Sequence, residues 1–277
     1  MKKLSALRAN LREFDRVIIA YSGGVDSAFL LCVAHEELGE RAQAIIGVSP
    51  SLLPEEFEAA KQLAAQIGAP VREVETHEIE DANYASNPTN RCYFCKSELW
   101  SVLEKLAQRE GFDAICDGTN TDDAREWRPG SQAGAEHLVR SPLREAGLSK
   151  AEIRELSREL GLPTWDKPAM PCLSSRIPYG QPVTREALHR VGRAEVWLRE
   201  RGLREVRVRH FTENDKPQAR LEIAPDELPH LFEFYAEAAA RLRELGFEAV
   251  LLDLEGYTRG KMNVAAGVGP QPIALIL

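Results

Sequence analysis

Six consecutive residues near the start of the chain could bind a phosphate group. The segment Ser22-Gly-Gly-Val-Asp-Ser27 follows a short apolar run and precedes a segment of helical composition. Glycines let the backbone approach an anion, and a helix N-terminus adds about half a positive charge. Serine hydroxyls can donate to phosphate oxygens, and Asp26 could hold a divalent cation such as Mg²⁺. The predicted phosphate loop therefore comprises Ser22, Gly23, Gly24, Val25, Asp26 and Ser27.

This loop follows neither of the two commonest nucleotide-binding patterns. It lacks the lysine of G-x-x-x-x-G-K-[ST] and the glycine spacing of G-x-G-x-x-G. A plain glycine turn capped by serine is the alternative. The position between a predicted strand and a predicted helix favours a phosphate site.

Three of the five cysteines are candidates for chemistry. Cys92 and Cys95 form a C-x-x-C between predicted elements, and Cys172 lies in a proline-rich stretch. Cys32 and Cys116 are expected to be inert core thiols. A closed zinc site needs four ligands, and these thiols supply three. A redox disulfide and coincidental surface cysteines stay possible, but an iron–sulfur cluster with one open iron fits the number of thiols best.

Charge and composition exclude several classes of protein. The 277 residues include 35 basic and 43 acidic side chains, a net charge of −8, which argues against nucleic-acid binding across a broad surface. No apolar run approaches the roughly 18 to 20 residues of a membrane span. An odd number of cysteines and no visible export signal predict reduced thiols in the cytoplasm.

Strands and helices alternate in the first part of the chain. Strands are expected at 17–20, 42–48, 71–74 and 114–116, and helices at 26–38, 54–67, 96–110 and 149–160. This alternation predicts an α/β fold with a doubly wound parallel sheet. The polar residues 124–132 predict a long surface loop.

The pattern changes in the second part of the chain. Residues 165–182 contain four prolines, so they cannot form one regular element. Beyond them, helices are expected at 184–200 and 225–245, and strands at 206–210, 219–223 and 249–254. We expect an ATP-binding domain over residues 1–180 and a smaller C-terminal α+β domain over residues 181–277.

Arg207 and Arg209 are candidates for binding a phosphate in the second domain. They lie two residues apart on a predicted strand, so their side chains should share one face. Two guanidinium groups side by side suit a phosphate. An exposed basic strand face paired with surface acids is the alternative.

The phosphate loop resembles the S-G-G-x-D-S signature of the PP-loop ATP pyrophosphatases. That resemblance implies ATP binding and cleavage between the α and β phosphates, with adenylation of a carbonyl or carboxylate oxygen. Gly47 and Val48 should then border the adenine at the carboxyl end of the second strand. Gly118 and Thr119 should face the same crevice.

Longer segments resemble the LarE family, the ATP-dependent sulfur transferases of nickel-pincer nucleotide synthesis. The resemblance rests on Arg91-Cys-Tyr-Phe-Cys-Lys96, Asp117-Gly-Thr-Asn120, Arg128-Pro-Gly130, residues 165–180 around Cys172, and Gly256-Tyr257. It implies a small-molecule partner, pyridinium-3,5-dicarboxylic acid mononucleotide, whose carboxylates become thiocarboxylates for the cofactor of lactate racemase. It also implies assembly into a homo-oligomer.

The resemblance gives further residues a role. In the simpler family form, the cysteine matching Cys172 gives up its own sulfur and becomes dehydroalanine. The chain is similar to the three-cysteine variant, in which Cys92, Cys95 and Cys172 would hold a 4Fe-4S cluster carrying an extra sulfide. Ser175 and Arg176, next to Cys172, would be phosphate or carboxylate contacts. Glu195 and Asp226 match family positions associated with a metal near the active site, and solvated surface carboxylates are the alternative for both.

Two other functions compete with sulfur transfer to a mononucleotide. A tRNA-thiolating enzyme would need a substantial basic surface, and the net charge of −8 counts against it. An amide-forming synthetase using ammonia would have no need of three cysteines, and no glutaminase segment is visible.

Overall fold

The computed structural model describes residues 2–125, 129–168, 170–258 and 261–267. The chain divides into two compact units. Unit 1 comprises residues 1–78 and 90–170, and unit 2 comprises residues 79–89 and 171–277. The chain therefore leaves unit 1 at residue 79 and returns to it at residue 90. The domain bounds of 1–180 and 181–277 stay a prediction.

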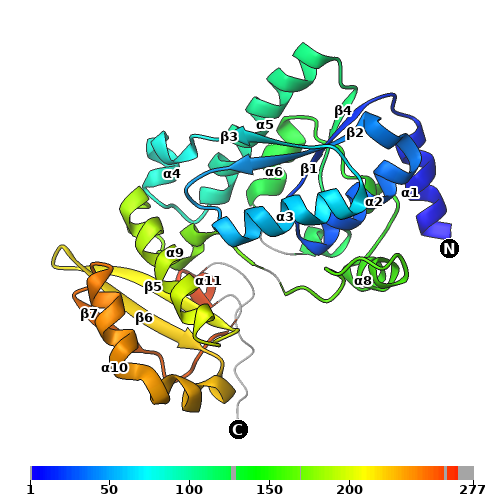
Figure 1. Ribbon diagram of the computed structural model, residues 1–277. Coiled ribbons are helices and arrows are strands. Elements are labelled where there is room, and N and C mark those ends of the chain that lie inside the picture. Colours follow the sequence, from blue (N-terminus) through cyan, green and yellow to red (C-terminus); the bar gives the residue numbers. More distant parts are fainter. Residues whose placement is uncertain (1, 126–128, 169, 259–260, 268–277) are drawn as a thin grey trace, which may run out of the picture. The chain divides into compact units, whose positions relative to one another are not determined.

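Unit 1 is built on a four-stranded parallel sheet (Figure 1). Its strands are β1 (Val17–Ala20), β2 (Ala42–Val48), β3 (Val71–Glu75) and β4 (Ala114–Cys116), in the order β3-β2-β1-β4. The chain winds outward from β1 to β3 and then crosses to the other side of β1. The segments after β1 and β4 thus leave the sheet at a topological switch point, where open α/β sheets bind ligands.

Helices cover both faces of this sheet. Val17 and Ile19 belong to one hydrophobic core, whereas Ile18 belongs to a second core with Trp100, because successive strand residues point to opposite faces. The first core is covered by α1 (Lys2–Arg12), α2 (Val25–Leu38), α3 (Pro54–Ile67) and α8 (Lys150–Glu159), and the second by α5 (Arg91–Glu110) and α6 (Pro129–Glu136). The predicted doubly wound α/β fold is confirmed.

Short helices complete unit 1, and one predicted loop is wrong in part. They are η1 (Gly39–Arg41), η3 (Asp122–Arg125) and α7 (Pro142–Glu145). Residues 129–132, expected in a loop, form the first half of α6 because the buried Ala133 packs in the same core as Trp100. Residues 126–128, which include Arg128 of the LarE-like segments, lie outside the described residues.

Unit 2 contains a three-stranded mixed sheet in the order β5-β6-β7 (Figure 1). The strands are β5 (Val206–Glu213), β6 (Lys216–Ile223) and β7 (Ala249–Leu252); β5 and β6 are antiparallel, and β6 and β7 are parallel. Asn214 and Asp215, with φ of 50° and 61°, form the two-residue hairpin turn that such φ values favour. Two long helices, α9 (Arg185–Glu200) and α10 (Leu228–Glu244), pack against the sheet.

Four short helices lie between or after these elements: η2 (Glu78–Glu80), α4 (Ala82–Ala85), η4 (Leu173–Arg176) and η5 (Pro225–Glu227). A last helix, α11 (Lys261–Ala265), precedes the end of the described chain. Within the described residues, no helix has the length and apolar character that crossing a membrane requires.

Candidate functional site

The phosphate loop makes a tight turn from β1 into α2. Gly23 has φ of +68°, and a Cβ there would lie 2.6 Å from the Cβ of Ala60, so only glycine fits. The backbone N–H of Ser22 donates to Ser27 Oγ at 3.2 Å, and the two serine hydroxyls lie 3.1 Å apart. The N-cap of α2 is Gly24, which has no side chain to cap the first turn. The helix N-terminus is therefore open to an anion.

The segment after β4 lies directly against this loop. A Cβ on Gly118 would come within 2.9 Å of the backbone nitrogen of Ser27. Asp117 accepts hydrogen bonds from the backbone N–H of Thr119 at 3.1 Å and from the Thr119 hydroxyl at 2.7 Å. The structure thus brings Gly118 and Thr119 to the phosphate loop, at the switch point.

Gly47 and Val48 lie at the carboxyl end of β2, beside β1. Ala20 pairs with Ile45, and the N–H of Tyr21 donates to the Ile45 carbonyl at 2.9 Å. All ten residues predicted to bind ATP therefore lie at one edge of one sheet, including Val25, which is buried at the start of α2. Their contacts with ATP stay predictions.

Cys92 and Cys95 lie within helix α5. The prediction that they lie between elements is therefore wrong. They are one turn apart near the start of α5, and residues at this spacing share a helix face. The helix starts early because Tyr93 packs against the second core and donates its hydroxyl to Glu136 at 2.5 Å. Cys92 is exposed and Cys95 is half-buried.

The other two cysteines of unit 1 are packed thiols. Cys116 is fully buried, and Cys32 packs against the first core. Burial raises the pKa of the Cys32 thiol to about 11 and that of the Cys116 thiol to about 12. Both stay protonated at neutral pH, as expected of core thiols.

Alkylation should separate the two kinds of cysteine. At pH 8, thiols with pKa values of about 11 and about 12 are ionised in roughly one molecule in 1,000 and one in 10,000. We expect iodoacetamide to modify the exposed Cys92 and Cys172 in metal-free folded protein and to spare Cys32 and Cys116. Peptide mass spectrometry measures this, and rapid modification of Cys116 would contradict the assignment.

In unit 2, Cys172 is exposed at the start of η4, above a buried arginine. The Arg176 guanidinium is fully buried and donates to the carbonyls of Pro171 at 2.5 Å and Cys172 at 3.1 Å. Its other nitrogens donate to Glu195 of α9 at 2.9 and 2.8 Å. This ion pair fixes the backbone that carries Cys172.

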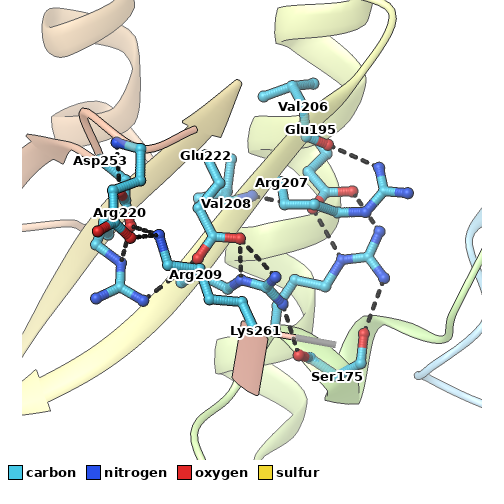
Figure 2. A network of polar contacts seen from close by, with 12 residues as sticks. Ser175, Glu195, Val206, Arg207, Val208, Arg209, Arg220, Glu222, Asp253 and Lys261 are labelled. Carbon is cyan, nitrogen blue, oxygen red and sulfur yellow. Dashed lines mark hydrogen bonds and ion pairs between the residues drawn. The ribbon is translucent and has the colours of Figure 1, made fainter. Parts of the chain in front are cut away.

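Arg207 and Arg209 extend the same network from β5 (Figure 2). Arg209 pairs with Glu222 of β6 and donates to the Ser175 carbonyl at 2.9 Å. Arg207 lies over the Tyr257 ring at 4.9 Å. Burial, and then the charge of Arg176, lower the pKa of Arg207. The structure thus brings Ser175, Arg176, Arg207 and Arg209 together, with both strand arginines more than nine-tenths buried.

Glu195 and Asp226 lie in different environments. Glu195 Oε1 also accepts from the backbone N–H of Val208 at 3.0 Å, and Oε2 from Arg199 at 3.2 Å. Asp226 is exposed in η5. No three His, Cys, Asp or Glu side chains form a metal-binding group in the described part of the chain. Cations and N–H donors surround Glu195, and a metal role for either carboxylate stays a prediction.

Residues 79–89 support the segment around Cys172, and the sequence pattern gave no prediction of this role. Tyr84, buried in α4, lies with its hydroxyl 2.6 Å from that of Ser174. Asn87 is fully buried with φ of 57°, and its amide donates to the carbonyls of Ile177, Pro178 and Gln181 at 3.3, 2.7 and 2.9 Å. The Asn-Pro dipeptide was a turn signal that could have identified this anchor.

Comparisons with known proteins agree with this geometry. The NAD synthase family model matches residues 4–97. A protein of Synechocystis described as uncharacterised is 50% identical over 263 residues, which cover 94% of this chain and 97% of that protein. The pyridinium-3,5-bisthiocarboxylic acid mononucleotide synthase of Lactiplantibacillus plantarum is 36% identical over 262 residues, 94% of each chain. The chain belongs to the LarE family.

A LarE-family chain is an ATP-dependent sulfur transferase, and the phosphate loop at the switch point agrees with this.

A shorter stretch of the chain is similar to a tRNA-modifying enzyme. The tRNA-5-methyluridine(54) 2-sulfurtransferase of Pyrococcus horikoshii is 34% identical over 119 residues, which cover 41% of this chain and 37% of that protein. The LarE match extends over more than twice as many residues.

Two lysines of this LarE-family chain reach the phosphate loop from distant positions. Lys150 Nζ lies 2.5 Å from Asp26 Oδ2, and Lys167 Nζ donates to the Gly23 carbonyl at 3.4 Å and to Glu56 at 2.7 Å. The loop lacks the lysine of the pattern G-x-x-x-x-G-K-[ST]. This lack is the feature of the sequence that could have indicated a lysine from elsewhere in the chain.

Proposed function

We propose that this chain uses ATP to adenylate the carboxylates of pyridinium-3,5-dicarboxylic acid mononucleotide and converts them into thiocarboxylates for a nickel-pincer cofactor. The observation that carries the proposal is the 36% identity, over 94% of both chains, with a synthase named for the bisthiocarboxylic acid product. The phosphate loop and the exposed Cys172 supply the two chemical functions that this reaction needs.

The ATP half of the reaction belongs to unit 1. The open N-terminus of α2 and the hydroxyls of Ser22 and Ser27 would hold the pyrophosphate that leaves. Asp26 fits a role as a Mg²⁺ ligand, because its Oδ1 is buried and has no hydrogen-bond partner among the described residues. A cation bound there would offset the negative charge of the pyrophosphate as it departs.

The arginines of unit 2 would orient the substrate. Arg209 donates to the Ser175 carbonyl, and Arg207 lies two residues before it on β5; an anionic phosphate or carboxylate is the ligand that such a group attracts. The substrate contacts of Ser175, Arg176, Arg207 and Arg209 are part of this proposal. The net charge of −8 argues against a broad basic surface, which favours a small anion over a polynucleotide.

The thiols of Cys92, Cys95 and Cys172 would hold a 4Fe-4S cluster. The donor set fits, because three thiolates leave one iron open, and because Cys92 and Cys95 share one helix face. When bound, the cluster would supply sulfide from the iron that no cysteine ligates. The chain's own task is then to keep the three thiolates intact while Arg176 fixes the backbone at Cys172.

A product assay tests the substrate. Purified, anaerobically reconstituted protein is incubated with Mg²⁺, ATP and either the pyridinium mononucleotide or tRNA, and the products are analysed by mass spectrometry. We expect AMP, pyrophosphate and a mononucleotide in which sulfur has replaced carboxylate oxygen. Thiolated tRNA with an unchanged mononucleotide would overturn the proposal in favour of tRNA thiolation.

The cluster has its own test. We expect the reconstituted protein to show the visible absorption of a 4Fe-4S cluster and matching iron and sulfide contents. Cys92→Ala should lose both, whereas Cys32→Ala, which removes a packed thiol, should retain them. Equal iron and sulfide in the Cys92→Ala and wild-type proteins would exclude a cluster held by these three cysteines.

A further inference from the structure

One buried side chain holds the segment that follows Cys172. Asn87 lies between α4 and α5, is fully buried, and donates its side-chain amide to the carbonyls of Ile177, Pro178 and Gln181 at 3.3, 2.7 and 2.9 Å. We propose that Asn87 is a positioning residue for Cys172, which it keeps in the geometry that sulfur transfer needs. The proposal rests on the proposed function, in which the reaction depends on the Cys172 thiol.

The segment that Asn87 holds has no regular structure of its own. Residues 177–182 form neither helix nor strand, and two of them are prolines, which have no backbone N–H. Carbonyls that folding removes from water need another donor. Arg176 supplies such donors on the Cys172 side of the segment, and Asn87 supplies them on the other side. The position of the segment therefore depends on these two side chains.

The same stretch of chain makes two further contacts with this segment. The N–H of Gly180 donates to the Asn87 carbonyl at 2.9 Å, so the segment and Asn87 exchange hydrogen bonds in both directions. Tyr84, buried in α4, has its hydroxyl 2.6 Å from that of Ser174, two residues after Cys172. Asn87 thus acts within a set of contacts that brackets the start and the end of the segment.

The backbone of Asn87 has a conformation that serves this purpose. Its φ of 57° lies in the left-handed region, which asparagine tolerates better than most residues. Such a conformation costs free energy, persists where the surrounding contacts fix it, and is commonest at functional sites. In the exposed hairpin turn, Asn214 has a similar φ of 50°, which there reverses the chain. At Asn87 the conformation is buried and accompanies the three contacts of the amide.

A change at Asn87 should affect one half of the reaction. Asn87 and the carbonyls that it binds belong to unit 2, whereas the phosphate loop belongs to unit 1. We therefore expect ATP cleavage to continue when Asn87 is replaced, while sulfur transfer becomes slower. A merely structural role predicts something different, because a smaller fraction of folded molecules lowers both rates equally and leaves their ratio unchanged.

Asn87→Asp tests this role with little change in shape. A carboxylate oxygen replaces the amide nitrogen, so an acceptor instead of a donor faces the three carbonyls. We expect the ratio of thiocarboxylate formed to pyrophosphate released to fall roughly 10- to 100-fold, because a displacement of about 1 Å can cost about 100-fold in rate. The matched control is Asn214→Asp, the same substitution at an exposed left-handed residue, which should keep the wild-type ratio.

Hydrogen–deuterium exchange of the protein alone gives a second readout. The amides of Gly180 and Val183 donate to the carbonyls of Asn87 and Ala85, and they should exchange faster in Asn87→Asp. The amides of β6 should keep their wild-type protection. Asn87→Gly, which accepts the left-handed backbone but lacks the amide, provides the same comparisons if the aspartate variant does not fold.

The two readouts separate the possible failures. Unchanged exchange at Gly180, or faster exchange with a wild-type ratio of the two products, would overturn the positioning role. A wild-type protein that forms no thiocarboxylate would instead overturn the proposed function. Faster exchange at Gly180 would in that case still support the anchoring of the segment by Asn87.

Discussion

Replacing Glu195 by glutamine should destabilise the packing of α9 on β5 by about 3 to 5 kcal/mol, the loss typical of a buried charge whose partner is removed. Arg176 and Glu195 are both fully buried and joined by two hydrogen bonds. Glutamine keeps the shape but leaves the Arg176 charge without its counter-ion. Because Arg176 also donates to the Cys172 carbonyl, the backbone at Cys172 should loosen with it.

Hydrogen–deuterium exchange of the α9 and β5 peptides measures this loss. The matched control is Glu237→Gln, which breaks the exposed pair with Arg201 and should change the stability little, because solvent screens exposed charges. Equal protection of α9 and β5 in Glu195→Gln and in the wild type would show that the buried pair adds no stability.

The same pair predicts a pH dependence. Burial alone would raise the pKa of Glu195, but the hydrogen bonds and charge of Arg176 outweigh it, so its pKa is lowered. A carboxylate with a lowered pKa stabilises the fold above its unfolded value of about 4.3 and loses that contribution as the pH falls toward the folded value. The difference between wild type and Glu195→Gln should therefore be constant near neutral pH and shrink in acid.

Replacing Cys172 by alanine should lower the rate of sulfur transfer by more than about a thousandfold and leave the rate of ATP cleavage near that of the wild type. The reaction depends on this thiol whether it holds the proposed cluster or donates its own sulfur, and losing a group on which bond formation depends costs rate factors of this order. Cys172 is exposed in unit 2, whereas the phosphate loop belongs to unit 1. The variant removes a thiol from an exposed position, so the fold should persist.

Paired assays of pyrophosphate release and thiocarboxylate formation separate the two steps. Cys32→Ala, which loses a thiol packed against the first core, is the control and should keep both activities. Thiocarboxylate formation by Cys172→Ala at the wild-type rate would remove Cys172 from the reaction.

Local patterns predicted most of the regular structure of unit 1. The apolar runs at 17–20 and 42–48 and the helix at 54–67 appear with the expected ends, because short length and β-branched residues mark the strands, and Pro54 and Gly68 bound the helix. The first turn of α5 and the start of α6 could not be found in this way. They are helical because Tyr93 and Ala133 pack into a core that only the tertiary fold creates.

In the candidate site, too, features formed by consecutive residues could be predicted, and contacts between distant residues could not. The phosphate loop was visible in the sequence because its residues are consecutive. Lys150 was not, because it meets Asp26 from 124 residues away. Burial was equally invisible: Arg176 meets Glu195 through the packing of η4 on α9, which no spacing in the sequence encodes.

We propose that this LarE-family chain transfers sulfur to the pyridinium mononucleotide repeatedly. The test is to count the moles of thiocarboxylate formed per mole of anaerobically reconstituted chain, with ATP, Mg²⁺ and sulfide in excess. The mass of the peptide that contains Cys172 is then measured by mass spectrometry. We expect product in molar excess over the chain and an intact Cys172. One sulfur or fewer per chain, with Cys172 converted to dehydroalanine, would contradict the cluster-based reaction, and no thiocarboxylate at all would contradict the function.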